Sequence, residues 1–464
     1  MKTSIALARA GVSSVLEPGD SGYADAVGGF DLSVPFAPDV VIDAHSPSEV
    51  ASAIAVAADR GETLTVLGAG HGRLQQAKGG VAITLRHLDS IDVDPGGRTA
   101  RVGAGLTWDP VLAATAPHGL AAVCGSAPGV GVVGYLLGGG IGPLQSSLGF
   151  SSDHVRSFDI VTPADGPITV SKDDHSDLFW ALRGGKGGFG VVTSVTIELL
   201  EVTHVYGGGV YFAAEDAAAV LGTYADWAPS LPGSSTTSIA LLRLPPVDAL
   251  PEAIRGRHVA HVRFASLDPG DTTRAQLDDI RGLARPLLDT VGDLPYGQLG
   301  TIHGDPRDPM PVVNGTASLA TLNGDTVDAV LGAADLEANR PLSSVEIRTL
   351  GPATRPELPE ADAVGGRSTV HLFNVYGAPV PALTDTDRIT AVRGVLSAVE
   401  QWQAPVNLVN FLGRANDADA VMHSWTAEQH GRLDAIRARH DPDGLFPYAQ
   451  HGESAPGTSS LPVH

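Results

Sequence analysis

The chain has 464 residues, 43% of them hydrophobic and 18% charged, a composition typical of a soluble globular protein with more than one domain. Its 52 acidic and 30 basic residues give a net charge of −22, which disfavours binding to nucleic acid. No apolar run is long enough to span a membrane, and the single cysteine, Cys124, excludes an internal disulfide and a cysteine-based zinc site. The apolar stretch near the start is interrupted at Arg9, so we expect a cytoplasmic protein rather than an exported one.

The first 200 residues alternate strand and helix signals. A capping box at residues 46–49, with Pro47 at the first helical position, predicts a helix that ends at Gly61. A turn at residues 95–97 between two β-rich runs predicts a hairpin. In chain order we predict a strand at 40–42, a helix at 47–60, strands at 63–67, 81–85, 91–93 and 99–102, helices at 108–116 and 177–183, and a strand at 191–200.

From about residue 203 to residue 407 glycine becomes rarer and longer helices separate the strand runs. This pattern is typical of an α+β domain with an antiparallel sheet. We predict helices at 215–227 and 271–289, strands at 238–244, 258–264, 345–350 and 369–375, and a last amphipathic helix at 425–439.

Glycine is concentrated in two segments and one short loop. Eight of the 18 residues from Gly125 to Gly142 are glycine, as are five of the seven from Gly184 to Gly190. Such density indicates backbone that lies against a ligand or, alternatively, a set of loops and helix–strand packing points. The strand at 63–67 runs into the short loop at 68–72, whose amides can converge on an anion beside His71.

The segment Gly129-x-Gly131-x-x-Gly134, with Asp153 19 residues farther on, has the spacing of a dinucleotide-binding fingerprint. This spacing leaves open a nicotinamide-dependent dehydrogenase. However, Pro128 precedes the segment and more glycines follow it, whereas the fingerprint opens the first helix of a βαβ unit. The glycines at 184–188 lack the spacing and the Ser/Thr of a P-loop, which argues against ATP hydrolysis.

Seven stretches, in order along residues 20–450, carry a family likeness: 70–71, 102–108, 131–149, 177–185, 189–193, 409–413 and 432–446. Together they resemble the FAD-linked oxidases of the vanillyl-alcohol-oxidase/PCMH superfamily, in particular bacterial berberine-bridge-enzyme-like oxidoreductases. The resemblance implies an α+β fold with an FAD-binding PCMH-type domain in two parts, residues 1–202 and 411–464. It also implies an inserted substrate domain, residues 203–410, whose antiparallel sheet is covered by helices.

The resemblance further implies how the cofactor is held. His71 matches the histidine that, in this family, bonds covalently to the 8α-methyl group of the flavin, and Val132 matches a position that influences oxygen access. Members with a second covalent link have cysteine where this chain has Ala127, so we predict FAD with one covalent bond. The cofactor-binding residues implied are Leu67, Gly68, Ala69, Gly70, His71, Gly72, Arg73, Ala127, Pro128, Gly131, Val132, Gly134, Gly138, Gly139, Gly140, Gly142, Asp153, Gly190, Val192, Tyr448 and Gln450.

Oxidation of an alcohol or amine by flavin needs a base that takes the O–H or N–H proton while hydride moves to the ring. Alternation along residues 369–376 places Asn374 and Tyr376 on one face of a strand, and Glu346 and Arg348 share a face of the preceding strand. The resemblance implies that one face of this sheet covers the flavin, so these four residues are the catalytic candidates. Leu408 stands where many relatives have tyrosine on the substrate side, which leaves the identity of the base open.

The sequence therefore predicts an FAD-dependent oxidoreductase, and more narrowly an oxidase that uses molecular oxygen. We expect it to take a hydride from a hydroxyl-, amine- or activated-carbon-bearing small molecule, and the family implies a role in secondary metabolism. The alternatives are a nicotinamide-dependent dehydrogenase and a flavin-holding protein without redox turnover. The polar loop at 301–306 either lines the mouth of the pocket or forms a plain turn. Substrate identity and oligomeric state stay open.

Overall fold

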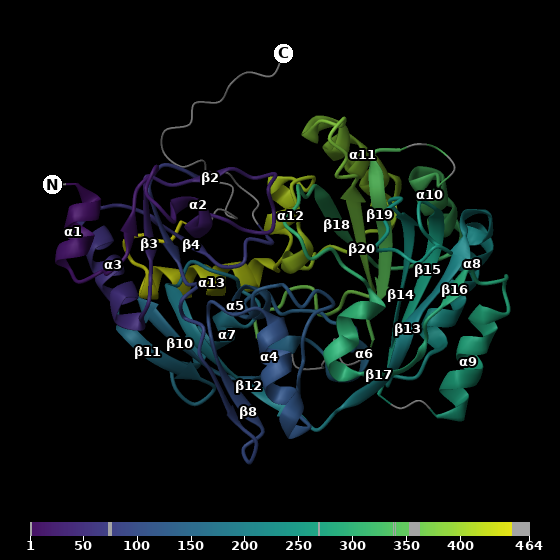
Figure 1. Ribbon diagram of the computed structural model, residues 1–464, viewed down its shortest axis with the longest axis horizontal. Helices are drawn as coiled ribbons and strands as arrows, with labels where there is room; N and C mark the ends of the chain where they lie inside the picture. The colour runs from purple at the N-terminus through teal and green to yellow at the C-terminus, as the bar shows by residue number, and fades with distance from the viewer. Residues whose placement is uncertain are drawn as a thin grey trace.

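The computed structural model describes residues 2–72, 77–267, 270–336, 338, 340–351 and 362–447. They form two halves that lie side by side along the longest axis of the molecule (Figure 1). The first half contains the N-terminal strands and helices together with the C-terminal helix. The second half contains a large antiparallel sheet with helices on one face.

A small sheet of order β1–β3–β6–β4 opens the first half, and its last three strands are parallel. The helix predicted between β3 and β4 is confirmed: Ser46 Oγ accepts a hydrogen bond from the amide of Glu49 at 3.3 Å, and Gly61 ends the helix with a φ of 64°. The Glu49 carboxylate binds the amides of His45 and Ser13 instead of that of Ser46, so only half of the predicted capping box forms. The elements are α1 (Thr3–Arg9), β1 (Val15–Leu16), α2 (Tyr23–Ala26), β3 (Val40–Asp43), α3 (Pro47–Arg60), β4 (Leu64–Leu67) and β6 (Val81–Thr84), with β2 (Phe36–Ala37) and β5 (Ala77–Lys78) paired separately.

A second sheet, of order β11–β10–β12–β8–β7, is antiparallel and includes the predicted hairpin of β7 and β8. Short helices lie in the connections between its strands. The elements are β7 (Ile91–Asp94), β8 (Thr99–Gly103), α4 (Trp108–Thr115), β9 (Ala121–Ala122), α5 (Val132–Leu136), α6 (Gln145–Leu148), β10 (Val155–Thr162), β11 (Gly166–Ser171), α7 (Ser176–Leu182) and β12 (Val191–Leu200).

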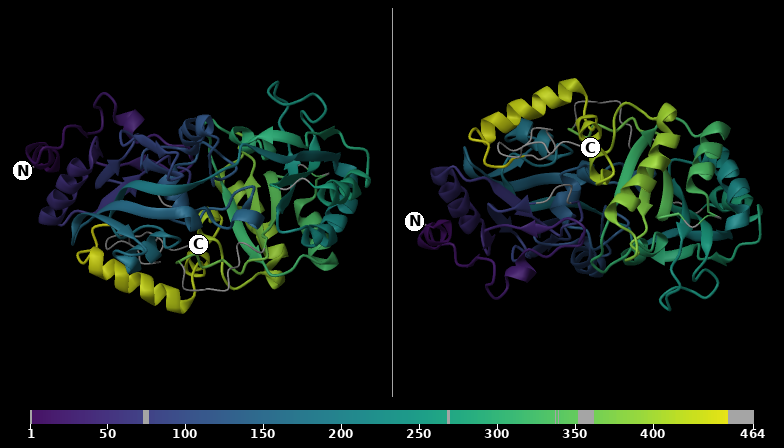
Figure 2. Two further views of the ribbon diagram at one scale, coloured as in Figure 1. Left: turned by 90° about the horizontal axis from the view of Figure 1, so that it is seen from below. Right: turned by 90° about the horizontal axis from the view of Figure 1, so that it is seen from above.

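The C-terminal segment returns to this first half. Helices α12 (Ala418–Met422) and α13 (Ala427–His440) come last among the described elements, and α13 runs along the first half in every view (Figures 1 and 2). Trp425 Nε1 donates to the carbonyl of Gly184 at 3.2 Å, and Arg437 Nη2 donates to the carbonyl of Gly185 at 2.9 Å. These bonds attach the end of the chain to the glycine segment at 184–190.

The second half is built on an antiparallel sheet of order β16–β13–β15–β14–β19–β20–β18. Helices α8, α10 and α11 cover one face through a shared apolar core, which confirms the predicted helix-covered antiparallel sheet. The elements are β13 (His204–Ala213), α8 (Ala217–Trp227), β14 (Ser235–Arg243), β15 (His258–Ser266), α9 (Asp271–Arg281), β16 (Leu288–Asp289), β17 (Gly292–Pro295), the 3-10 helix η5 (Tyr296–Ile302), β18 (Asn314–Leu319), α10 (Gly324–Ala334), β19 (Leu342–Thr349), β20 (His371–Gly377) and α11 (Asp385–Ala398).

The sequence predictions for this half were incomplete, since strand β18 and helices α10 and α11 were not predicted, and two further elements need comment. The helix predicted at 271–289 is too long, because α9 ends before Gly282 and Pro286 and the chain then forms β16. Strand β13 was not predicted, because Gly207 to Gly209 made it resemble a loop. A Cβ atom at Gly209 would lie 2.0 Å from Nε2 of His261, so the glycine lets that imidazole pack against the strand.

A small apolar cluster joins the two halves. Two of its side chains come from the first half, and the others come from the large sheet and from the loops that follow its strands. The cluster consists of Ile141, Phe150, Leu350, Val364, Leu372 and Leu408. The free face of the large sheet is therefore held against the glycine-rich segments of the first half. No helix among the described residues has the length and apolar character that crossing a bilayer requires.

Candidate functional site

The glycine loop at residues 68–72 follows β4 directly. Gly70 has a φ of 75°, in the left-handed region that favours glycine. Within the described part of the chain, the backbone amides of Ala69, Gly70, His71 and Gly72 donate no hydrogen bond. Because none of these four residues is fully buried, their N–H groups are available to a bound anion.

His71 lies at the tip of this loop. Its ring stacks on Phe30 with 4.0 Å between the ring centroids and 11° between the planes. Burial lowers the pKa of His71 and outweighs the opposing effects of a hydrogen bond to the Gly129 backbone and of the Asp305 and Asp31 charges. The imidazole is therefore neutral at physiological pH, and the Gly129 backbone of the glycine-rich segment 125–142 lies beside it.

The loop at 68–72 and the glycine-rich segment 125–142 meet at Gly131, where a Cβ atom would lie 3.4 Å from the Cβ of Ala69. Four glycines that flank this contact have no such neighbour. A Cβ atom at Gly68, Gly72, Gly129 or Gly134 would meet no other atom within 4 Å. Backbone without side chains, from the loop at 68–72 and from the segment 125–142, thus borders open space on both sides of the contact between Gly131 and Ala69. This is the arrangement expected if the two segments embrace one ligand.

The remaining glycines of these segments are packed against protein. A Cβ atom at Gly142 would lie 2.0 Å from the carbonyl oxygen of Cys124, and one at Gly140 would lie 2.3 Å from the ring of Tyr135. Likewise, a Cβ atom at Gly190 would lie 2.3 Å from the carbonyl oxygen of Val161. For these positions the structure supplies a packing reason for glycine, which was the alternative left open from the sequence.

The catalytic candidates gather on the free face of the large sheet. Glu346 on β19 is paired with Asn374 on β20, and Arg348 lies level with Ser238 on β14 and Arg263 on β15. Alternate residues of a strand share a face, so these side chains form two adjacent rows. The face turned to the helices carries apolar residues instead, including Ile347 and Phe373.

Glu346 is the centre of a buried charged cluster and is 3% exposed. Its carboxylate accepts hydrogen bonds from Arg348 Nε at 2.9 Å, from Asn374 Nδ2 at 3.1 Å and from Arg263 Nη1. Burial would raise the pKa of Glu346, but the charges of Arg348 and Arg263 and the bonds from Arg348 and Asn374 lower it below its ordinary value. Glu346 is therefore an ionised carboxylate in a site that excludes water.

Tyr376, the fourth catalytic candidate, lies on the same strand as Asn374 and two residues farther along. Burial and the charge of Glu346 raise the pKa of its phenol, so the hydroxyl stays protonated. Three of the four candidates, Glu346, Arg348 and Asn374, are thus joined by hydrogen bonds, and Tyr376 lies within electrostatic range of them.

Comparison with known proteins identifies the fold and an FAD binding domain. A family model described as an FAD binding domain matches residues 38–171. The chain is 26% identical over 455 residues to (R)-6-hydroxynicotine oxidase of Paenarthrobacter nicotinovorans, covering 93% of this chain and 94% of that protein. It is 37% identical over 184 residues to an FAD-linked oxidoreductase of Gibberella zeae, covering 38% of this chain and 33% of the fungal protein. Its structure matches that of glucooligosaccharide oxidase from Acremonium strictum with a TM-score of 0.81 at 20% identity, covering 96% of this chain and 98% of the other.

Residues 38–171 therefore form an FAD binding domain, and the similar proteins are FAD-linked oxidases and oxidoreductases. FAD is therefore the cofactor of this chain. The nicotinamide-dependent alternative receives no support, since the run from Gly129 to Gly134 opens the five-residue helix α5 and not the first helix of a βαβ unit.

The residues of this FAD-linked oxidoreductase fit a dinucleotide. The amides of residues 69–72 suit the pyrophosphate, which carries negative charge that an acidic protein must compensate locally. The open backbone at Gly129 and Gly134 gives the same ligand room on the other side of the contact. His71 belongs to the loop at 68–72, and its ring lies beside Gly129 of the segment 125–142.

Several residues that matter here were not singled out from the sequence. Lys186 donates from Nζ to the carbonyl of Gly134 at 3.2 Å and to Oδ1 of Asn410, and burial lowers its pKa to about 8. Asp305 accepts a hydrogen bond from Ser126 Oγ at 2.7 Å, which joins the loop at 301–306 to the glycine-rich segment 125–142. The sequence pointed only to the polar loop that contains Asp305. The contacts of Lys186 could not be predicted, because its partners Gly134 and Asn410 are distant in the chain.

The other predicted cofactor residues have the following places. Leu67 ends β4, Val132 opens α5 and is buried, and Val192 is buried in β12. Ala127 is half-buried and Pro128 is buried. Asp153 binds Arg367 and accepts from the amide of Phe150 at 2.9 Å. Arg73, Tyr448 and Gln450 lie outside the described residues.

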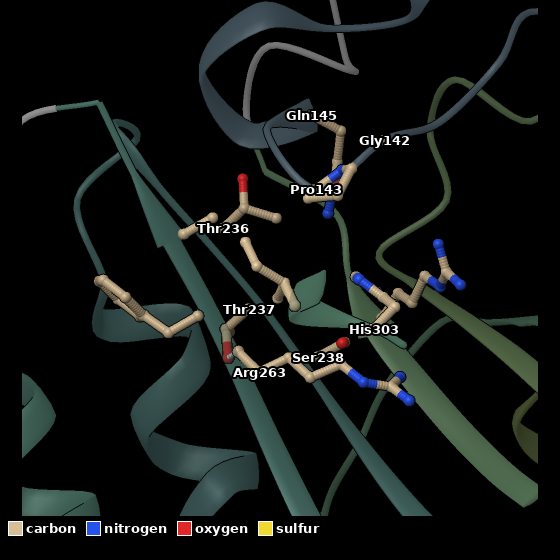
Figure 3. A pocket seen from close by; sticks show the side chains of 12 residues that line it. Gly142, Pro143, Gln145, Thr236, Thr237, Ser238, Arg263 and His303 are labelled. Atoms are coloured by element: carbon tan, nitrogen blue, oxygen red, sulfur yellow. Dashed lines mark hydrogen bonds between the residues drawn. The ribbon is translucent and has the colours of Figure 1, made fainter. Parts of the chain in front are cut away.

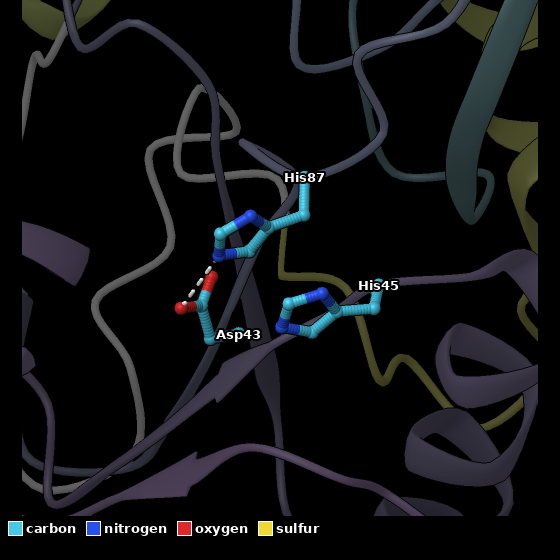
Figure 4. Close-up of side chains that lie close together, drawn as sticks. All are labelled: Asp43, His45 and His87. Atoms are coloured by element: carbon cyan, nitrogen blue, oxygen red, sulfur yellow. Dashed lines mark hydrogen bonds and ion pairs between the residues drawn. The ribbon is translucent and has the colours of Figure 1, made fainter.

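A separate cluster of Asp43, His45 and His87 has potential metal-ligand atoms within 4.8 Å of one another (Figure 4). The imidazoles of His45 and His87 stack at 4.0 Å, and His87 Nε2 lies 3.1 Å from Asp43 Oδ2. Arg86 engages both oxygens of Asp43, with Nη2 at 2.6 Å from Oδ2. We assign the cluster as an ion-pair network, because a guanidinium occupies the carboxylate that a cation would need.

Proposed function

We propose that this FAD-linked oxidoreductase is an oxidase that takes a hydride from a hydroxyl-, amine- or activated-carbon-bearing small molecule and passes the electrons to molecular oxygen. FAD, when bound, would supply a redox-active ring able to accept a hydride. Two of the similar proteins are oxidases, of 6-hydroxynicotine and of glucooligosaccharides, which supports the proposal. The observation that carries it is the ionised, water-excluded carboxylate of Glu346 on the sheet face turned toward the glycine segments.

Each side chain of the Glu346 cluster has a separate role in removing the substrate proton. Glu346 accepts the substrate O–H or N–H proton at a carboxylate oxygen as the C–H bond is broken. Arg348 and Asn374 position that carboxylate by direct hydrogen bonds. The protonated phenol of Tyr376 donates a hydrogen bond to the substrate heteroatom. Burial limits the access of bulk water to Glu346, Arg348 and Asn374, whereas Tyr376 is partly exposed.

We further propose that His71 forms the single covalent bond to the flavin. A neutral imidazole with one nitrogen bound to the Gly129 backbone keeps the lone pair of its other nitrogen free for this bond. In glucooligosaccharide oxidase, FAD is joined through both a cysteine and a histidine. Here Ala127 replaces the second tether, and Cys124 cannot serve instead because burial raises the pKa of its thiol to about 12.

The tether is tested by denaturing the purified protein in acid and following the yellow colour. We expect the colour to stay with the precipitated wild-type chain and with a His45→Ala control, in which an exposed histidine of the same half is removed. The colour should pass into the supernatant for His71→Ala. Colour that remains on the His71→Ala chain would refute the assignment of His71.

Turnover separates an oxidase from a flavin-holding protein. The holoenzyme is mixed without oxygen with a panel of alcohols and amines while flavin absorbance is recorded, and oxygen is then admitted. We expect at least one donor to bleach the flavin and hydrogen peroxide to form on reoxidation. If no donor bleaches the flavin, the protein only holds it. If bleaching occurs but reoxidation needs an acceptor other than oxygen, it is a dehydrogenase.

The chain division at 1–202, 203–410 and 411–464 also remains a proposal. It is supported by the apolar cores, since the main core of the first half includes Leu433 and Ile436 of α13 as well as N-terminal side chains. The core of the large sheet is formed by side chains from Tyr206 to Ala415, so it extends slightly past residue 410. Tyr296 and Leu299 of the middle segment pack in the first core.

A further inference from the structure

A narrow cavity lies beside the Glu346 cluster, between the two halves. Figure 3 shows Gly142, Pro143 and Gln145 on one side and the strands carrying Thr236 to Ser238 and Arg263 on the other, with His303 beside them. The space for the centre of a water-sized molecule is about 10 Å³, so the cavity takes one water-sized polar group. It can therefore hold the end of a substrate but not a whole substrate.

The lining of this cavity is cationic. It includes the guanidinium groups of Arg263 and Arg348, which are 5% and 7% exposed, and no carboxylate. Behind the lining, the single carboxylate of Glu346 is shared by both arginines. Asp305 acts on Arg348 from farther away and is hydrogen-bonded to Ser126. Two buried cations with one directly bound anion leave a local demand for negative charge in a chain whose net charge is −22.

Unused hydrogen-bonding groups surround the same space. Ser238 Oγ and His303 Nδ1 are buried and have no partner among the described residues. In the described part of the chain, Nη2 of Arg263 and both terminal nitrogens of Arg348 also donate no hydrogen bond. Buried polar groups in proteins are normally satisfied, so unpartnered groups on several residues that line one cavity point to a ligand that accepts hydrogen bonds there.

We propose that this cavity is a subsite for a carboxylate carried by the substrate. The inference rests on the proposed oxidase function and narrows its substrate class to alcohols or amines that bear a carboxylate. One carboxylate oxygen matches the size of the cavity, and two neighbouring guanidinium groups match the charge and the paired acceptors of the group. Arg263, Ser238 and Arg348 lie in one row across β15, β14 and β19, because the strand register pairs Ser238 with both arginines. All three can therefore contact the same carboxylate.

The subsite is tested on the flavin-containing enzyme with radiolabelled benzoate in equilibrium dialysis, with unlabelled benzamide as the neutral competitor. We expect benzoate to bind and benzamide to compete at least about 10-fold more weakly, since a hydrogen bond to a charged group is worth a factor of about 10 to 100. Arg263→Gln should weaken benzoate binding by about 10- to 100-fold. The matched control is Arg243→Gln, which removes a half-buried arginine of β14 that binds the carbonyls of Ala334 and Asp335 away from the cavity.

Ser238→Ala provides a second variant with a smaller change in volume and charge, and it should weaken benzoate binding without altering flavin content. Benzamide that competes as well as benzoate, or equal benzoate binding by Arg263→Gln and Arg243→Gln, would overturn the carboxylate subsite. A water molecule would then be the natural occupant. That failure is distinct from failure of the proposed function, which would show as a flavin that no donor reduces while benzoate binding is unaffected.

Discussion

Replacing Glu346 by glutamine tests whether this carboxylate both balances buried charge and accepts the substrate proton. The substitution keeps the shape of the side chain and the acceptor for Arg348 Nε, but it leaves Arg263 and Arg348 as two buried cations without their shared anion. It also removes the only charged proton acceptor within the hydrogen-bonded cluster described around residue 346. Stability and catalysis should therefore both fall.

The size of the stability loss follows from the geometry. Unit charges about 4 Å apart interact with about 4 kcal/mol at an effective dielectric of about 20, and breaking a buried pair typically costs about 3–5 kcal/mol. Removing Arg263 instead leaves Glu346 paired with Arg348, at 2.9 Å, so Arg263→Gln should cost less than Glu346→Gln. The double variant has one cation and no anion, the same local net charge as the wild type. We expect it to recover about 2 kcal/mol relative to Glu346→Gln.

Stability is measured by urea unfolding of the four holoenzymes, and catalysis by the rate of anaerobic flavin reduction. Flavin reduction should slow about 100- to 10,000-fold in Glu346→Gln, and the double variant should not recover it, because the proton acceptor is still missing. An unchanged midpoint in Glu346→Gln would refute the charge argument. A reduction rate within a few-fold of the wild type would refute the role of Glu346 as the base.

Three further predictions follow from single side chains. The pKa of Lys186 is about 8 in the folded chain and 10.5 in a model peptide, so the unfolded state binds more protons between these values. The free energy of unfolding should therefore rise by up to about 3 kcal/mol from pH 8 to 10.5, and urea melts should show that Lys186→Met removes this rise. Gly142→Ala should lower the midpoint of thermal unfolding, because its Cβ would lie 2.0 Å from a carbonyl oxygen. Gly222→Ala should raise that midpoint, because Gly222 lies on α8 with open space around it. Equal midpoints for the two variants would contradict the packing argument. Cys124, whose thiol pKa is raised to about 12 by burial, should react with a disulfide reagent at about pH 8 only after denaturation, and rapid native labelling would show that the thiol is accessible.

Local sequence patterns predicted the parts of the fold that depend on neighbouring residues. The helix at Pro47–Arg60 and the strand at Val191–Leu200 have the predicted bounds, because a capping residue, glycine stops and continuous β-branched runs act within a few positions. Glycine density was less informative. The same local signal marks Gly134, which faces open space, and Gly142, which is packed against a carbonyl, and only the tertiary contact distinguishes them.

For the catalytic candidates too, the sequence predicted local geometry but not the contacts between distant segments. Alternation correctly placed Glu346 with Arg348, and Asn374 with Tyr376, on shared strand faces. It could not identify Arg263 as a partner of Glu346, because 83 residues separate them in the chain and strand register across β15, β14 and β19 brings them together. Periodicity determines which face a residue occupies, whereas its neighbours on that face depend on strand order and register.

The position of the charged cluster relative to the glycine segments depends, in turn, on apolar packing. Leu372 occupies the row of Arg348 on the large sheet, and it packs in one cluster with Phe150 and Ile141 from the first half. A substitution such as Leu372→Ala would thus loosen the contact that sets the distance between Glu346 and the flavin-binding segments, without touching either. Hydride transfer falls steeply with small errors in placement, so this variant should lose flavin reduction rate while keeping its flavin. Stopped-flow reduction at wild-type speed would show that the joint between the halves is fixed by other contacts.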